Sequence, residues 1–299
     1  MQVSESVAAA QSQDAPVVAL ESTIVTHGLP YPRNLETALA LEAEVRAHGA
    51  VPATIAVIGG VLRIGLEREE LAALAKAGDV RKLSRADFAA ALVQGATGST
   101  TVAATMIAAR LAGIETFATG GIGGVHRGAE TSFDISADLQ ELAQTPVNVV
   151  AAGAKAILDL PKTLEVLETL GVPVIGYRTD RFPAFWSRDS GHDVPIRMDD
   201  PAEIARAHRL RQAMGLQGGQ LVVNPIPEDA EISAELLKPH IEAAIREADA
   251  GGISGKDVTP FLLSRVLDLT EGRSLEANVA LVLNNARLAA KIAVALARA

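Results

Sequence analysis

Two isolated side chains in this sequence have the chemistry of a catalytic acid and an amine nucleophile. Glu21 follows the apolar stretch VVAL, and the end of a buried strand is a common position for a catalytic acid. Lys155 lies among alanines just after the apolar stretch VNVVAAG, a setting in which a lysine amine can act as a nucleophile. Each position also fits a structural role, as a surface acid at a strand end or as a lysine that reaches solvent from a helix start.

A cluster of carboxylates and hydroxyls is found in SFDISADL (132–139). It contains Asp134 and Asp138 together with Ser132 and Ser136. Oxygen ligands of these kinds suit a hard cation such as Mg²⁺ or Mn²⁺. The same segment also fits a helix start, with Ser136 as the N-cap and Asp138 in the first turn.

Two glycine-rich segments could bind an anion or bring the backbone close to a ligand. GATGSTT (95–101) places glycines and hydroxyls before a helix, whose first N–H groups bind anions, although a plain Ser/Thr cap fits equally. TGGIGGVHRG (119–128) is the densest glycine cluster and favours close backbone approach to a ligand. His126 and Arg127 at its end could contact phosphate, and a solvated loop is the alternative.

Neither glycine-rich segment predicts a known nucleotide loop. GATGSTT lacks the Gly-Lys of a Walker A motif, and GGISGKD (251–257) has Asp where that motif needs Ser or Thr. A dinucleotide-binding fold is disfavoured because no helix of the required pattern follows TGGIGGVHRG.

The C-terminal segment 274–296 predicts a long apolar helix that carries Asn278, Asn284 and Asn285. Asparagine is a weak helix former, so Asn278 within an apolar face must find hydrogen bonds. A ligand, a core contact or an interface contact could supply them.

The elements that must position these residues alternate along the chain. We predict strands at 16–23, 54–60, 61–66, 147–153, 173–177 and 220–225, a strand that breaks into glycines at 114–128, and a short strand or loop at 80–84. We predict helices at 34–49 (with Asn34 as N-cap), 67–78, 84–95, 136–144, 161–171, 201–214, 231–250, 257–270 and 274–298, and a loop that feeds a buried helix at 98–113. Continuously apolar strands alternating with helices predict an α/β fold with a mostly parallel sheet covered on both faces. Ligands bind at the carboxyl ends of such strands.

Composition excludes several classes of protein and of site. The 299 residues have a net charge of −9 with scattered Lys and Arg, which disfavours nucleic-acid binding. The chain has no cysteine, so disulfides and thiol chemistry are excluded. No apolar run reaches the roughly 18 residues of a membrane span, and the start lacks a signal-peptide pattern. We therefore expect a cytoplasmic protein with no membrane partner, a disordered lead-in at 1–14 and a single domain at 15–299.

Taken together, these segments resemble the pseudouridine-5'-phosphate glycosidases, also called the indigoidine synthase A-like family. The matching blocks cover nearly the whole chain in order: 19–38, 51–60, 94–106, 117–128, 132–139, 149–177, 182–186, 224–227, 255–263 and 274–289. The resemblance implies reversible cleavage of the C–C glycosidic bond of pseudouridine 5'-phosphate to uracil and ribose 5-phosphate. It also implies a divalent cation, usually Mn²⁺, a three-layer α/β/α fold and a cytoplasmic homotrimer.

The resemblance also implies roles for individual residues. Glu21 matches the proton donor, Lys155 the nucleophile and Asp134 the metal ligand. The positions that match substrate contacts of the family are Lys82, Val102, Ser136, Ala137, Asp138 and Asn278, the last against the base or the sugar. To these we add His126 as an expected substrate contact, from its place at the end of the glycine cluster.

Two other function classes fit parts of the sequence. A sugar or nucleoside kinase would also be α/β and glycine-rich, but a Walker A loop is missing. A sugar-phosphate-binding regulator would not need Glu21, Asp134 and Lys155 together, and the chain shows no basic surface pattern for DNA.

Overall fold

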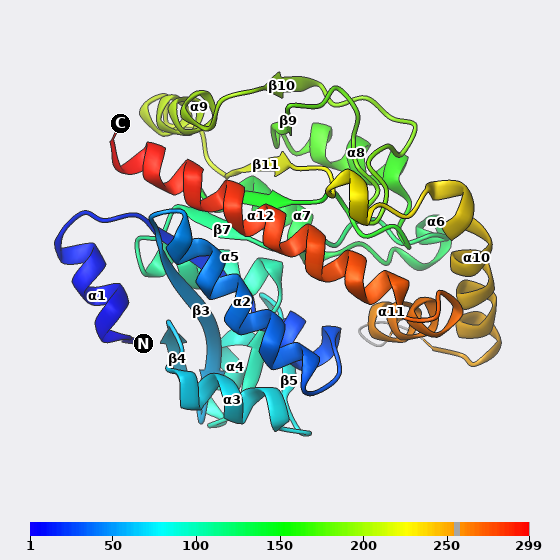
Figure 1. Cartoon of the computed structure of the whole chain (residues 1–299), viewed down its shortest axis with the longest axis horizontal. Coiled ribbons are helices and arrows are strands. Elements are labelled where there is room, and N and C mark those ends of the chain that lie inside the picture. Colours follow the sequence, from blue (N-terminus) through cyan, green and yellow to red (C-terminus); the bar gives the residue numbers. More distant parts are fainter. Residues whose placement is uncertain (254–257, 299) are drawn as a thin grey trace.

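The computed structural model describes residues 1–253 and 258–298 and is built on one mixed sheet (Figure 1). Its eleven strands run in the order β1-β4-β3-β2-β7-β8-β11-β9-β10, and β6 joins β5 to β3. The strands are β1 Gln2–Val3, β2 Val17–Leu20, β3 Val51–Ile58, β4 Val61–Ile64, β5 Arg81–Leu83, β6 Gly98–Thr100, β7 Thr116–Ala118, β8 Asn148–Ala151, β9 Val174–Tyr177, β10 Ile196–Met198 and β11 Gln220–Val223. Only the pairs β3–β4 and β3–β6 are antiparallel.

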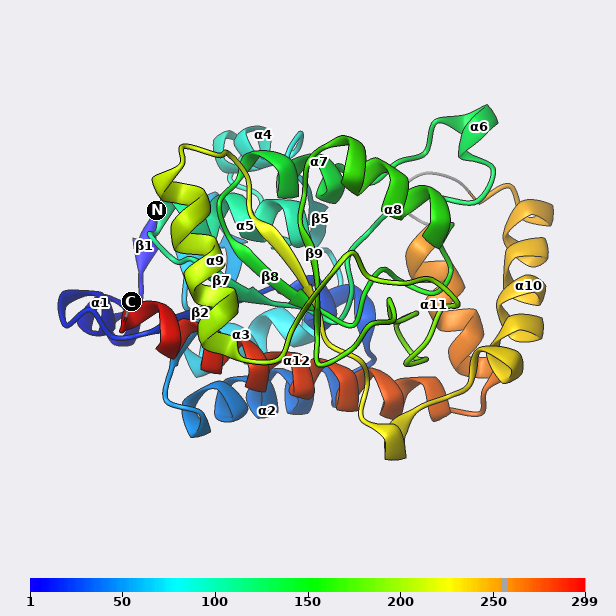
Figure 2. The ribbon, with the colours of Figure 1, turned by 90° about the horizontal axis from the view of Figure 1, so that it is seen from above.

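Helices cover both faces of the sheet. They are α1 Glu5–Ser12, α2 Arg33–Ala47, α3 Arg68–Lys76, α4 Phe88–Val93, α5 Val102–Leu111, α6 Ala129–Ser132, α7 Ala137–Gln144, α8 Leu160–Thr169, α9 Pro201–Ala213, α10 Ala234–Ala250, α11 Val258–Leu269 and α12 Arg273–Ala297, with a π-helix Ile24–Gly28 and a 3-10 turn Glu228–Ala230. In Figure 2, α2 and α12 lie along one face, and α5, α7 and α8 lie along the other. The predicted three-layer α/β/α architecture with a mixed, mostly parallel sheet is confirmed.

The register of the central strands brings their carboxyl ends to one edge. Leu20 of β2 pairs with Ala118 of β7, Ala118 with Val150 of β8, and Val150 with Val222 of β11. Because these four strands are parallel, the loops that leave them emerge side by side. The loop after β2 carries Glu21, and the loop after β8 carries Lys155.

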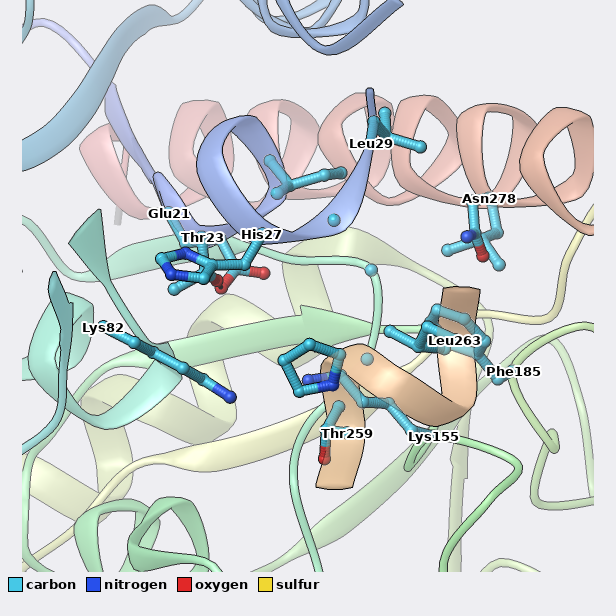
Figure 3. A pocket seen from close by; sticks show the side chains of 16 residues that line it. Glu21, Thr23, His27, Leu29, Lys82, Lys155, Phe185, Thr259, Leu263 and Asn278 are labelled. Carbon is cyan, nitrogen blue, oxygen red and sulfur yellow. Dashed lines mark hydrogen bonds between the residues drawn. The ribbon is translucent and has the colours of Figure 1, made fainter. Parts of the chain in front are cut away.

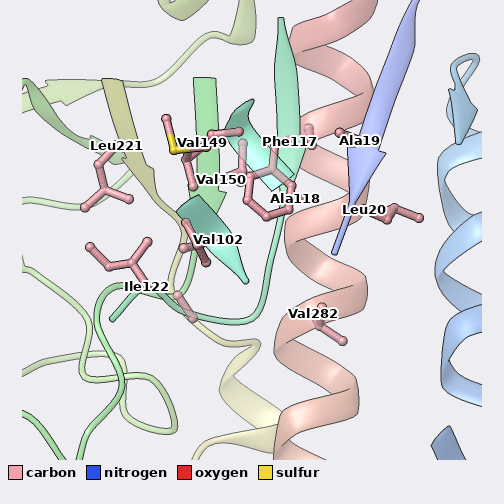
Figure 4. Packing of buried hydrophobic residues seen from close by; sticks show 14 of the residues in the cluster. Ala19, Leu20, Val102, Phe117, Ala118, Ile122, Val149, Val150, Leu221 and Val282 are labelled. Carbon is pink, nitrogen blue, oxygen red and sulfur yellow. The ribbon is translucent and has the colours of Figure 1, made fainter. Parts of the chain in front are cut away.

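The core is made of aliphatic side chains from both faces of these strands. Figure 4 shows Phe117 and Val149 of neighbouring strands packed near α12, and both are fully buried. Among the described residues, α12 alone has the length and apolar character of a membrane-crossing helix. However, 56% of its most apolar 18-residue stretch is buried within this chain. It packs against α2, α9 and the sheet, so its apolar character serves the core.

The predicted disordered lead-in at 1–14 is wrong. β1 pairs with β4, and α1 follows, with the Ser4 hydroxyl accepting from the Val7 N–H as the N-cap. Val7 and Ala10 are buried, so the segment is anchored by a cap, a strand pair and two core side chains. The segment is rich in alanine and glutamine, as flexible linkers are, and this composition led to the prediction of disorder.

The prediction that Asn34 is the N-cap of α2 is also wrong. The helix begins at Arg33, and the Asn34 side chain is buried. Its amide donates to the carbonyls of Val25 (2.6 Å) and Ala75 (2.9 Å), which ties the π-helix to α3. Several other elements had no signal in the sequence analysis: the strands β6 and β10, the short helix α6, the π-helix and the 3-10 turn.

A partly buried polar cluster lies at the opposite, amino-terminal edge of the sheet and should control acid stability. Arg209 donates to both carboxylate oxygens of Glu115 at 2.8 and 2.7 Å, Gln212 donates at 2.7 Å, and His208 lies 3.7 Å away. His208, Gln212 and Arg209 together outweigh burial and lower the pKa of Glu115 to about 2. A carboxyl whose pKa is depressed on folding stabilises the protein above its ordinary pKa of 4.5, and this stabilisation is lost as the pH falls toward 2.

We expect Glu115→Gln to lower the free energy of unfolding at pH 7 by about 1–2 kcal/mol, less than the full linkage value because the carboxyl keeps some solvent contact. Urea unfolding at pH 7 and pH 3 would show a smaller difference from wild type at pH 3. Glu36→Gln is the control, because its ion pair with Arg33 is exposed and should change stability by less than about 0.5 kcal/mol. An equal effect of Glu115→Gln at both pH values would contradict the prediction.

Candidate active site

Two connected pockets lie at the carboxyl edge of the sheet. One, here the apolar pocket, has a cavity volume of about 70 Å³ and is walled largely by Leu281 and by Leu29, Phe185 and Leu263 (Figure 3). The other, here the polar pocket, has a cavity volume of about 350 Å³ and is lined by the start of α5, the glycine-rich loop after β7 and the segment 134–138. The residues that line both pockets are Glu21, Thr23, Lys82, Lys155 and Thr259. The predicted acid and the predicted nucleophile therefore face the same space, at the junction of the pockets.

Two threonine hydroxyls and a buried asparagine hold Glu21 in place. The hydroxyl of Thr23 donates to one carboxylate oxygen, and that of Thr119 donates to the other. The amide of Asn285 donates to the Thr119 carbonyl at 2.8 Å, so α12 fixes the loop that holds the acid. Hydroxyls suit this role because they can donate to a carboxylate and accept from a carboxylic acid.

Lys155 is positioned by the backbone of the loop after β8. Its N–H donates to the Ile122 carbonyl at 3.1 Å, which joins this loop to the glycine-rich loop after β7. The preceding turn requires glycine, because Gly153 has φ +82° and a Cβ there would lie 2.2 Å from the Pro183 carbonyl oxygen. The backbone of the lysine is therefore rigidly placed, and its side chain reaches into the pockets (Figure 3).

The start of α5 forms one end of the polar pocket. Thr101 is the N-cap and accepts from the Ala104 N–H. Among the described residues, the Val102 N–H has no protein acceptor, and Val102 lines the pocket. Lys82 lies on β5 beside β6, which leads into this helix, and Figure 3 shows its amine extended toward the pockets. A free N–H group at a helix start together with a nearby amine suits a phosphate.

Asp138 joins two loops of the polar pocket. Its carboxylate oxygens accept from the Ala103 N–H at 2.9 Å and from the Gly123 N–H at 2.8 Å. Ser136 is the N-cap of α7, and its hydroxyl accepts from the Asp138 N–H. This agrees with the interpretation of 132–139 as a helix start. Ser136, Ala137 and Asp138 all line the pocket. The contacts of Asp138 hold the α5 start and the glycine loop at a set distance.

Asp134 and His126 stand together in the polar pocket. The Asp134 carboxylate is 3.9 Å from the His126 ring. The His126 N–H donates a hydrogen bond of 3.0 Å to the Asp134 carbonyl. Burial lowers the pKa of His126 despite the opposing effect of Asp134, and Lys155 and Lys82 lower it further. The imidazole is therefore neutral at pH 7 and can accept or donate a hydrogen bond.

The donor set near Asp134 fits a hard cation bound mainly through water and substrate. The described residues contain no group of three or more His, Asp or Glu that could hold a metal by protein ligands alone. Mg²⁺-like cations commonly bind through one or two carboxylates, several waters and substrate phosphate oxygens. One partly exposed carboxylate beside the phosphate-binding end fits that pattern.

Several residues that shape the site were not selected from the sequence. His27 lines the apolar pocket, and burial, followed by the charge of Lys82, lowers its pKa. Thr23 and Thr119 hold the acid, and a threonine near a carboxylate has no distinctive sequence signal. Asn285 was visible as a polar residue on an apolar helix, which is the signal that could have identified it.

One residue that the sequence suggested as a phosphate contact lies apart from the two pockets. Arg127 lines neither of them and borders a third pocket, which shares His126 and Asp134 with the polar pocket. GGISGKD falls partly on 254–257, outside the described residues, so its conformation is not described. The glycines of TGGIGGVHRG approach protein groups as well as the pockets, since a Cβ at Gly121 would lie 2.7 Å from Phe185.

Comparison with known proteins gives a consistent family. The model of a family described as indigoidine synthase A like protein matches residues 6–295. A Paracoccus denitrificans (strain Pd 1222) protein named pseudouridine-5'-phosphate glycosidase is 71% identical over 284 residues, covering 94% of this chain and 93% of that protein. The crystal structure of the prealnumycin C-glycosynthase AlnA in complex with ribulose 5-phosphate has a TM-score of 0.92 at 40% identity, covering 99% of this chain and 97% of the other. An indigoidine synthase A-like protein from Thermotoga maritima MSB8 has a TM-score of 0.89 at 37% identity, covering 96% and 94%.

Proposed function

This chain belongs to the indigoidine synthase A-like protein family, and from that premise we propose that it cleaves the C–C glycosidic bond of pseudouridine 5'-phosphate reversibly. The products are uracil and ribose 5-phosphate. The observation that carries the proposal is the position of Glu21 and Lys155 in the lining shared by the polar and apolar pockets. A ligand with a phosphorylated sugar in one pocket and a base in the other has its glycosidic bond between these two residues.

The names of similar proteins support this reaction class. The Paracoccus relative is named for the same substrate, and AlnA is named as a C-glycosynthase and binds a pentose phosphate, ribulose 5-phosphate. A C–C bond to uracil has no leaving heteroatom to protonate, so the two-carboxylate scheme of ordinary glycosidases would expel a carbanion. The chemistry therefore needs a different pair of residues, an acid and an amine.

Ring opening followed by amine addition avoids the carbanion. Glu21 protonates the ribose ring oxygen, the C1'–O bond breaks, and C1' becomes an electrophile conjugated with the base. The amine of Lys155 adds to C1' through its lone pair and releases a proton. A proton is then delivered to C5 of the base, the C–C bond breaks, and its electron pair remains on uracil while the lysine holds the sugar as an iminium. Water hydrolyses the iminium to release ribose 5-phosphate and the free amine.

The phosphate and the cation belong to the polar pocket in this proposal. The Val102 N–H and Lys82 bind phosphate oxygens. Asp134 would hold a divalent cation, Mn²⁺ in the proposal, and a bound cation supplies positive charge that neutralises the phosphate and orients it. His126, neutral at pH 7, lies beside Asp134 and can hydrogen-bond the sugar phosphate or a water.

We expect the purified protein with Mn²⁺ to convert pseudouridine 5'-phosphate to uracil, followed by the ultraviolet change of the base and by chromatography. Treatment with a chelator should reduce the rate by at least about 10-fold, and added Mn²⁺ should restore it, because one carboxylate holds the cation weakly. Asp134→Asn should show the low rate without restoration. Pseudouridine without phosphate is the matched substrate control. Consumption of ATP with a sugar or nucleoside, or ligand binding without turnover, would overturn the proposal.

A further inference from the structure

We propose that Trp186 is a positioning residue that fixes the amide of Asn278, so that the apolar pocket presents an N–H donor and selects a base with a carbonyl oxygen at that edge. The inference rests on the proposed function and adds a basis for base discrimination to it. Its starting point is a contact between a fully buried indole and a pocket-lining amide.

The indole decides which way the amide of Asn278 faces. The Trp186 Nε1–H donates to the Asn278 Oδ1 at 2.7 Å and also lies 3.2 Å from the Ser274 carbonyl oxygen. An indole N–H can only donate, so the amide atom that faces it must be the oxygen. A flipped amide would place two donors against each other in a buried setting, which costs about 1–3 kcal/mol.

The fixed oxygen leaves the amide NH₂ of Asn278 for the pocket. Within the described part of the chain, this nitrogen has no protein acceptor. Figure 3 shows the amide on the side of α12 that faces the apolar pocket, which Phe185 and Leu263 also line. Donors beside apolar walls favour a ligand that brings an acceptor, so the pocket is matched to a carbonyl oxygen.

The chain holds Trp186 firmly enough for this role. Phe185 has φ +61°, a left-handed conformation that is rare for a bulky residue, and its N–H donates to the Ala152 carbonyl at 3.0 Å. This bend lets Phe185 face the pocket, while Trp186 enters the core and meets the Phe185 ring edge-on at 5.1 Å. The Trp186 carbonyl accepts from the Ile232 N–H, which fixes the segment from the other side.

The fixed donor distinguishes carbonyl from amino substituents on a pyrimidine. Uracil has carbonyl groups at C2 and C4, cytosine replaces the one at C4 with an amino group, and isocytosine replaces the one at C2. An amino group at the contacted edge would oppose N–H to N–H and leave both unpaired. One of the two amino pyrimidines should therefore bind poorly, and its identity reports which carbonyl the amide contacts.

Trp186→Phe tests the inference because it removes the indole N–H and keeps an aromatic ring. We would measure dissociation constants of uracil, cytosine and isocytosine by calorimetry without sugar phosphate, and KM and kcat for pseudouridine 5'-phosphate. Wild type should bind uracil at least about 10-fold more tightly than the disfavoured amino pyrimidine. In Trp186→Phe, uracil binding should weaken about 10-fold, the preference should fall to within about 3-fold, and kcat should change less than KM.

Phe182→Leu is the control for packing loss, since Phe182 is equally buried and lines neither pocket. It should lower the melting temperature without changing the preference among bases. If Trp186→Phe fails to fold, Asn278→Asp tests the inference instead. The aspartate keeps an oxygen acceptor for the Trp186 N–H and removes the amide donor, so this variant should also lose the preference for uracil. An unchanged preference in a folded Trp186→Phe, or in Asn278→Asp, overturns the inference. Preference for uracil without turnover of the nucleotide overturns the proposed function alone.

Discussion

Lys155→Ala is expected to abolish turnover of pseudouridine 5'-phosphate, with a loss of at least about 10⁴-fold, and to abolish covalent trapping of the sugar. The proposed route needs an amine at the junction of the two pockets, because only an amine forms an iminium with C1'. Borohydride should reduce that iminium in the wild-type protein incubated with ribose 5-phosphate. Mass spectrometry should then locate one sugar phosphate on the peptide that contains Lys155.

Two matched variants separate the amine from its charge and from lysines in general. Lys155→Arg keeps a positive side chain beside the phosphate-binding end and should still lose both turnover and trapping. Lys162→Ala removes an exposed lysine paired with Glu130 and Asp159, and it should leave both signals intact. Sugar trapped on Lys155→Ala at another lysine would move the nucleophile elsewhere, with Lys82 the next residue to examine because it lines both pockets.

The placement of the proposed reactive pair followed from patterns that operate at short range. Apolar strands followed by polar residues predicted both strand ends, and parallel strands must present those ends at one edge. The residues after β2 and β8 therefore had to lie near each other once the strand order was known. The order itself, with β7 between β2 and β8, depends on pairing across the whole sheet, and local sequence does not encode it.

The residues that hold the reactive groups were harder to predict. Thr119 and Asn285 are 166 positions apart and meet only because α12 packs across the end of β7. Trp186 lies in a loop next to Phe185, and nothing in its local sequence indicates a hydrogen bond to Asn278. Long-range contacts of this kind follow from helix packing on the sheet, which a periodic pattern does not specify.

Asp138 illustrates how one sequence signal can carry two functions. The segment 132–139 suggested a cation site or a helix start, and the structure has both a cap at Ser136 and a pocket-lining carboxylate at Asp138. Because that carboxylate accepts from two backbone N–H groups, its direct contribution to ligand binding is limited to its remaining lone pairs. The role of Asp138 as a substrate contact stays a prediction, and its role as a clamp between loops comes from the geometry.

Glu21→Gln should separate ring opening from amine addition. The amide has nearly the same shape and can keep hydrogen bonds to Thr23 and Thr119, so the fold should be unchanged, but it cannot transfer a proton. We expect kcat for pseudouridine 5'-phosphate to fall by about 10²–10⁴-fold, the range for loss of a general acid. Trapping of ribose 5-phosphate on Lys155 should persist, because this sugar opens to its aldehyde in solution and does not require the acid for that step.

Turnover and sugar trapping should therefore respond differently in the two variants. Lys155→Ala loses both turnover and trapping, whereas Glu21→Gln loses turnover and keeps trapping. Glu36→Gln, on the exposed face of α2, is the matched control and should keep both. If Glu21→Gln lost trapping as fully as Lys155→Ala, Glu21 would be needed for amine addition itself. The acid would then act on the lysine or on the aldehyde, and the order of steps proposed for the ribose ring would have to be reversed.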